Sequence, residues 1–121
     1  MSIDVQQAAL IARQNDIFRM SLGSDKSVPG RVVRTASLSV FGAYGILAIM
    51  RRVSAHADFT PDNDPYGHHD YGSFDIDLCA PPQKICWRID LYDQDYRWGS
   101  EAPTDLSQTR RVLTVMLPQD Q

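Results

Sequence analysis

The strongest strand pattern in this chain is Phe-Asp-Ile-Asp-Leu-Cys at residues 74–79, followed after five residues by Ile-Cys-Trp-Arg-Ile-Asp-Leu-Tyr at residues 85–92. Apolar and polar residues alternate on both arms, which buries one face of a strand and leaves the other exposed. The pattern therefore predicts an antiparallel hairpin. One register that keeps both apolar sets together gives the pairs Leu78–Trp87, Ile76–Ile89, Asp77–Arg88 and Cys79–Cys86.

The flanking segments predict two helices and two more strands. Apolar residues recur near helical spacing over residues 3–20, with Asn15, Asp16 and Arg19 off the apolar stripe. We expect strands at residues 30–36 and 111–117 and a second helix at residues 42–55. The order α-β-α-β-β-β predicts a single α+β domain over residues 1–121, with two helices packed on a mainly antiparallel four-stranded sheet.

Composition and charge narrow the function classes. With 43% hydrophobic and 22% charged residues, the chain is not a wholly disordered one. The apolar run at residues 40–50 is too short to cross a bilayer, and the N-terminus lacks the layout of a secretion signal. We therefore expect a cytoplasmic protein without a membrane partner. Cys79 and Cys86 are then thiols, although a disulfide between them stays an open alternative.

The charge is unevenly distributed. Residues 58–101 hold ten acids and three bases, a net charge of −7, whereas the remainder carries +4. A nucleic-acid binder would show a basic stripe interleaved with aromatic residues, but the aromatic residues here lie among the acids. We expect no direct contact with DNA or RNA.

Residues 58–72 are the most unusual segment and read Asp-Phe-Thr-Pro-Asp-Asn-Asp-Pro-Tyr-Gly-His-His-Asp-Tyr-Gly. Pro61 and Pro65 lack amide donors and restrict their neighbours, so the segment is a loop rather than a helix or a central strand. In the simplest interpretation Thr60 caps a single helical turn that Pro61 opens. The side chains of residues 62 to 64 then accept hydrogen bonds from exposed amides.

Besides this structural role, the side chains of the loop have two possible chemical roles. Asp62, Asp64, His69 and Asp93 are ligand types that suit magnesium, manganese or zinc, although their spacing matches no strong motif. His69 beside Asp70 is a candidate general base, because a carboxylate fixes the tautomer of an imidazole. Adjacent residues in an extended segment point in opposite directions, however. We expect no cofactor, with a divalent metal as the alternative.

The loop resembles the signature of a bacterial family of small proteins known as domain of unknown function 3768. Further segments that resemble it are Trp87-Arg88-Ile89-Asp90, Tyr92-Asp93-Gln94-Asp95, Gly99-Ser100 and residues 111–117, so the likeness runs from Ile11 onward. The family pattern often has His where Tyr66 stands and Glu where His68 stands, which weakens a metal role for both positions. The resemblance implies a bacterial, cytoplasmic protein sometimes carried on mobile elements. It implies no activity, because the family has none assigned.

The leading interpretation is a non-catalytic accessory or inhibitor protein, including one that serves a mobile element in counter-defence. Tyr and Trp carry much of the energy at interfaces, and a basic surface on another protein complements carboxylates. The candidate binding residues are Asp62, Asp64, Tyr66, His69, Asp70, Tyr71, Asp93, Asp95, Tyr96 and Trp98. The alternative is a small metal-dependent hydrolase or nuclease built on residues 58–72. The sequence leaves the partner and the oligomeric state open.

Overall fold

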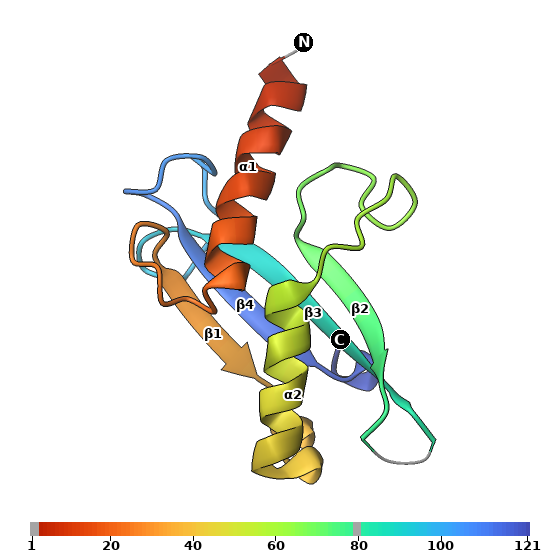
Figure 1. Cartoon of the computed structure of the whole chain (residues 1–121). Helices are drawn as coiled ribbons and strands as arrows, with labels where there is room; N and C mark the ends of the chain where they lie inside the picture. Colours follow the sequence, from red (N-terminus) through yellow and green to blue (C-terminus); the bar gives the residue numbers. More distant parts are fainter. Residues whose placement is uncertain (1–2, 79–80) are drawn as a thin grey trace.

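The computed structural model describes residues 3–78 and 81–121 (Figure 1). In chain order its elements are α1 (Ile3–Met20), β1 (Gly30–Arg34), η1 (Ala36–Phe41), α2 (Gly42–Ala55), β2 (Tyr71–Ile76), β3 (Gln83–Tyr92), β4 (Arg110–Met116) and η2 (Pro118–Asp120). The strands form one sheet in the order β1-β4-β3-β2, with β1 and β4 parallel and the other two pairs antiparallel. The α+β class and the order of the elements are as expected.

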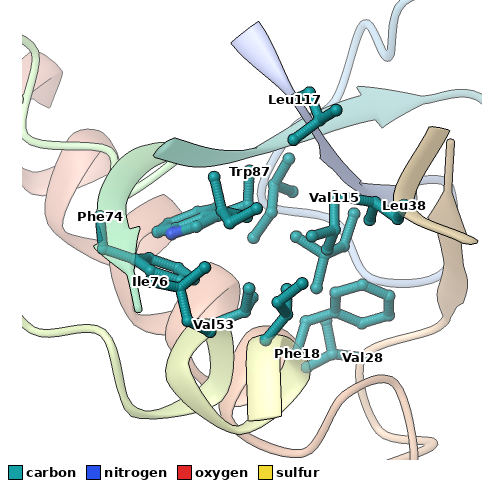
Figure 2. Close-up of a cluster of buried hydrophobic side chains, with 13 residues drawn as sticks. Phe18, Val28, Leu38, Val53, Phe74, Ile76, Trp87, Val115 and Leu117 are labelled. Carbon is teal, nitrogen blue, oxygen red and sulfur yellow. The ribbon is translucent and has the colours of Figure 1, made fainter. Parts of the chain in front are cut away.

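Both long helices cover the same face of the sheet (Figure 1). The core lies between the two layers, where Phe18 of α1 and Val53 of α2 meet Trp87 and Val115 of the central strands (Figure 2). All four side chains are fully buried. This packing gives each helix the apolar contact that a short helix needs in water.

The register of the hairpin differs from the expected one. Trp87 lies opposite Gly72 rather than Leu78, and Cys86 lies opposite Ser73. The residue Cys79, which was expected to face Cys86, lies outside the described residues. A shift by an even number of residues keeps every side chain on its face, so alternation alone does not fix the register. Trp87 decides it, because a Cβ at position 72 would lie 2.5 Å from the indole nitrogen.

The buried side of α1 also differs from the expectation. Asn15 and Arg19 were placed off the apolar stripe, yet they are 0% and 2% exposed, while Leu10 is exposed. Asn and Arg are usually exposed on the polar side of an amphipathic helix. Here they face inward because each finds hydrogen-bond acceptors or donors on other elements, which removes the cost of burying a polar group. These contacts build the region described below.

Residues 36–55 form a helical stretch long and apolar enough, by length and composition alone, to cross a membrane. The indication is weak, because a core helix of a soluble protein meets the same criterion. The stretch consists of two helices, η1 and α2, which meet at Gly42 with a φ of 69°. Leu38, Ile49 and Val53 anchor it in the core.

Candidate functional site

The first acidic loop, residues 58–70, connects α2 to β2 and is held by its own side chains. The Thr60 N–H donates to Asn63 Oδ1 at 2.7 Å, and the Asn63 N–H donates to Thr60 Oγ1 at 3.3 Å. The Asp64 N–H closes the turn by donating to the Thr60 carbonyl at 2.8 Å. Reciprocal bonds of this kind satisfy the amides that open a helical turn. The expected turn at Thr60 is therefore present.

His69 fixes the end of this loop. Its φ of 53° lies in the left-handed region, and its N–H donates to both oxygens of the Asp64 carboxylate at 3.3 Å. The ring lies flat against Phe59, with the centroids 3.9 Å apart. Nδ1 lies 3.0 Å from the Asp16 carboxylate of α1, so the Nδ1–H donates across to the helix. His69 thus joins the loop to α1 and is paired with Asp16 rather than Asp70.

Arg19 joins the same region to the end of α2. Its Nε and Nη2 donate to the carbonyls of Val53 and His56 at 3.1 and 2.9 Å, and its Nη1 donates to Asp16 at 2.9 Å. The carbonyls at a helix C-terminus lack partners within the helix and carry partial negative charge. A buried guanidinium satisfies them, and its charge is balanced by Asp16. The guanidinium also lies over the Trp87 ring, 5.0 Å from its centroid.

Two neighbouring residues of α1 form hydrogen bonds with the first acidic loop and with the loop that joins β3 to β4. Asn15 Nδ2 donates to the His68 carbonyl of the first loop at 2.9 Å. Gln14 Nε2 donates to the Thr104 carbonyl at 3.1 Å. The fully buried Arg111 of β4 donates to both side chains, at 2.7 Å to Asn15 and 3.0 Å to Gln14. Burial lowers the pKa of Arg111 to about 10.

The second acidic loop, residues 93–109, is also held by its own groups. Asp93 Oδ1 accepts hydrogen bonds from the N–H groups of Asp95 and Arg97, both at 3.1 Å. Tyr96 has a φ of 59°, and the Arg31 guanidinium of β1 lies 3.7 Å from its ring centroid. Trp98 remains 74% exposed.

Eight of the ten candidate binding residues fall into two groups. Asp64, His69, Asp93 and Tyr96 hold the loops in shape. Asp62 and Tyr66 of the first loop are exposed, as are Asp95 and Trp98 of the second. Helix α1 lies between the two loops, which leave the same end of the sheet (Figure 1). The acidic residues therefore form two neighbouring surfaces and not one continuous face.

Asp70 and Tyr71 lie where the first loop enters β2. Partial burial raises the pKa of Asp70, and the nearby His68, with its Nδ1 4.0 Å from the carboxylate, opposes the rise. The pKa of Tyr71 is raised, first by its hydrogen bond with Cys86 and then by burial. Tyr71 therefore points to the sheet face away from the helices, where Cys86 lies.

In the part of the chain that the structure describes, the candidate metal ligands do not lie around a common point. Within residues 3–78 and 81–121, no group of three or more His, Cys, Asp or Glu side chains could hold a metal ion. Asp93 belongs to the second loop, and Asp64 and His69 already bond each other. A cavity of about 260 Å³ lies beside His69, lined in part by Asp16, Arg19 and Ser54. The Ser54 hydroxyl donates to the Arg51 carbonyl, so it is not activated by His69.

Sequence reasoning missed Asp16, Arg19, Asn15 and His56 as parts of this region. Asp16 and Arg19 are three residues apart, a spacing that places them on the same side of a helix. That spacing is the one local signal for their pairing. Their contacts with the loop and with α2 join residues 34 to 53 positions apart, which no local pattern reveals.

The comparisons with known proteins point to one family. No curated protein and no solved structure matches the chain. Residues 34–120 match the family described as Protein of unknown function (DUF3768). The match includes both acidic loops and the strands β2, β3 and β4, and it begins after α1 rather than at Ile11. Because it spans most of the sequence, the chain belongs to the DUF3768 family.

Proposed function

We propose that this protein is a non-catalytic binding module that docks on a basic surface of another protein through its first acidic loop. It acts there as an accessory or inhibitor protein. In one version it occupies a surface that otherwise binds nucleic acid, since carboxylates can stand in for phosphates. In a special case of that version, the protein is carried on a mobile element and acts in counter-defence. The setting is the cytoplasm.

The observation that carries the proposal is the exposure of Tyr66 on a loop that is already held in shape. Its side chain is 78% exposed, and Asp58 and Asp62 are exposed on the same loop. Tyrosine offers a large contact area with little conformational entropy to lose, which favours it at interfaces. Because the loop is fixed by Asn63, Asp64 and His69, its groups are ordered before a partner arrives.

The second acidic loop extends the same end of the molecule. Asp95 and Trp98 are exposed beside a backbone that Asp93 holds. A partner that covers the first loop and crosses α1 would reach the second loop (Figure 1). An exposed Trp beside carboxylates suits a surface that carries arginine, which both stacks on aromatic rings and pairs with acids.

The hydrolase alternative lacks comparable support. It needs Asp62, Asp64, His69 and Asp93 around one ion, and these residues lie on two loops with α1 between them (Figure 1). His69 stacks on Phe59 and bonds Asp16, so its ring nitrogen serves the fold. We therefore do not assign a catalytic role to it.

The test is capture of a partner from host lysate by immobilised protein at low and at high salt. We expect one partner that is retained at low salt, lost at high salt, and lost in the triple variant Asp58→Asn, Asp62→Asn, Tyr66→Ala. The matched control Asp4→Asn, Asp25→Asn, Tyr44→Ala makes the same chemical changes at exposed positions elsewhere. Equal capture by both triple variants would contradict the proposal.

A further inference from the structure

The outer side of α2 carries apolar residues that the fold leaves uncovered. Tyr44 is 90% exposed, and Leu47, three residues further along the same side of the helix, is exposed too. Val40, in η1 just before α2, is 77% exposed. Only 22% of the most apolar part of residues 36–55 is buried. Single exposed apolar residues are ordinary, whereas three on one short helical stretch indicate an interaction surface.

The same side of the helix also carries a cation. Arg51 is exposed and follows Tyr44 by seven residues, which is about two turns. Residues 35–57 contain no Asp or Glu. In the part of the chain that the structure describes, no carboxylate forms an ion pair with Arg51. The surface is therefore apolar at the start of α2 and basic towards its end.

Most acids of the molecule lie away from this surface. Residues 1–57 hold seven bases and three acids, a net charge of +4, whereas residues 58–101 carry −7. Figure 1 shows the start of α2 at one end of the sheet and both acidic loops at the other end. An anionic surface that approaches the start of α2 therefore meets apolar and basic groups before it meets the loops.

The acids near this end are engaged or outnumbered. Asp75 of β2 alternates with the buried Phe74 and Ile76, so it points to the sheet face away from the helices, where its Oδ1 lies 3.4 Å from Lys84 Nζ. Asp120 accepts hydrogen bonds from two hydroxyls at the start of η1. Asp77 is exposed, but the cations Arg34, Arg51 and Arg52 outnumber it.

We propose that Val40, Tyr44, Leu47 and Arg51 dock the protein on a membrane that contains anionic lipid, with α2 lying along the bilayer surface. An interfacial helix combines large apolar side chains, which enter the headgroup boundary, with cations that pair with lipid phosphates. The outer side of α2 has both. Its inner side is anchored in the core by Ile49 and Val53, so the helix touches the bilayer from one side and does not span it.

Charge disfavours a second copy of the chain as the occupant. In an antiparallel pair of α2 helices, Arg51 of each copy would lie against the apolar start of the other. In a parallel pair, the two Arg51 side chains would meet. Both arrangements take a cation out of water without an acid to balance it, since residues 35–57 supply none. Lipid phosphates supply that counter-charge.

The test is flotation of the purified protein with vesicles of phosphatidylcholine alone and with vesicles in which phosphatidylserine makes up about one third of the lipid. We expect at least about tenfold stronger binding to the anionic vesicles at low salt, and a much smaller difference at high salt. This binding does not involve the first acidic loop, so its failure would leave the proposed function intact.

Two pairs of variants locate the contact. Leu47→Asp should weaken binding at least about tenfold, whereas Leu10→Asp, the same change at an exposed position of α1, should bind like the native chain. Arg51→Gln should weaken binding about fivefold, whereas Arg97→Gln, in the second acidic loop, should not. Thermal melting in the absence of lipid checks that each variant is folded.

A second arm requires no loss of binding. Tyr44→Trp places a fluorophore on the proposed surface, and its emission should shift to shorter wavelength with anionic vesicles and be quenched by brominated lipid. The native chain, whose exposed Trp98 lies on the second acidic loop, should show neither change. Membranes are cleared from the lysate used for partner capture, so Tyr44→Ala remains a control there.

Three results would overturn the inference: equal binding to both kinds of vesicle, equal binding by Leu47→Asp, or no quenching of the Tyr44→Trp fluorophore. Self-association without vesicles that Leu47→Asp abolishes would assign the surface to a second copy and would overturn the inference too.

Discussion

His69 and Arg19 share one carboxylate, that of Asp16 on α1. The imidazole holds the first acidic loop to this carboxylate, and the guanidinium holds the end of α2 to it. Removing a shared partner leaves a buried cation without a counter-charge, which is more costly than losing one exposed ion pair. The position of the loop therefore depends on a residue that precedes it by more than forty positions.

Asp16→Ala should lower the free energy of unfolding by about 1–3 kcal/mol, because Arg19 and His69 both lose their acceptor. Urea denaturation measures the change, and amide hydrogen exchange over residues 58–70 should become faster. Asp4→Ala, an exposed acid on the same helix, serves as the control and should change stability by about 0.5 kcal/mol or less. Equal effects of the two substitutions would show that Asp16 does not hold the loop.

His56 makes stability depend on pH. Burial lowers the pKa of its ring below the ordinary value of 6.5, and Nε2 is buried without a hydrogen-bond partner among the described residues. On acidification the unfolded chain therefore takes up a proton first. The contribution of His56 is present above the unfolded pKa and is lost as the pH falls through 6.5 towards the folded pKa.

His56→Phe should reduce the fall in melting temperature between about pH 8 and about pH 5, because Phe keeps the ring packing and cannot be protonated. The packing in question is edge-to-face contact with Phe59 and Trp87, at centroid distances of 5.1 and 5.3 Å. Calorimetry across this range measures the slope, with His68→Gln as the comparison. A slope unchanged by His56→Phe would exclude this residue as its cause.

Among the elements, the hairpin shows what alternation can and cannot predict. The period of two in residues 74–79 and 85–92 correctly indicates two strands and the buried side of Phe74, Ile76 and Trp87. The first strand, however, runs over Tyr71–Ile76, and Leu78 lies beyond it and is exposed. The period of two does not distinguish registers that differ by an even number of residues. The observed register depends on the fit of the Trp87 indole over a glycine, with three ring atoms within 2.8 Å of where a Cβ would stand. A glycine that leaves room for an aromatic ring carries no periodic signal.

Gly72→Ala tests this register directly. A Cβ at position 72 meets the Trp87 ring at 2.5 Å, so the substitution should cost about 1–3 kcal/mol of unfolding free energy. Gly99→Ala is the matched control, because nothing lies within 4 Å of its built Cβ. Denaturant titration of both variants gives the comparison. In the register with Leu78 opposite Trp87, position 72 is free of the ring and both substitutions would be harmless.

Helix α1 shows a different limit of sequence reasoning. Apolar spacing predicts the helix but assigns Asn15 and Arg19 to its outer side, whereas both are buried. Their acceptors and donors lie on α2, on β4 and in the first acidic loop, so their burial is a tertiary effect. Asp64 and Asp93 differ from these residues, because their carboxylates bond amides two to five positions away in their own loops. Residue type alone does not distinguish an acid that holds its own loop in shape from an acid that binds a partner.

On the scale of the whole molecule, most acids of residues 58–101 lie on two loops with α1 between them (Figure 1). Residues 58–101 carry a net charge of −7, but several of these acids are engaged with amides or with bases. In the docking that we propose, the remaining exposed acids steer a basic partner to one end of the fold, and the encounter rate depends on salt.

This division predicts the outcome of metal titration. Calorimetric titration with manganese or zinc should show no saturable binding, since Asp62, Asp64, His69 and Asp93 do not gather around one point in the structure. Asp93→Asn provides the comparison. Saturable binding that Asp93→Asn abolishes would revive the hydrolase interpretation and would require the two loops to meet.

Hydrogen–deuterium exchange of the protein alone and in complex with its captured partner tests the docking surface most directly. We predict slower exchange within residues 58–70, the first acidic loop, and a smaller change near Trp98. The exposed residues of α2 should exchange as they do in the free protein. Protection centred on α2 with residues 58–70 unchanged would contradict the assignment of the first acidic loop as the binding surface.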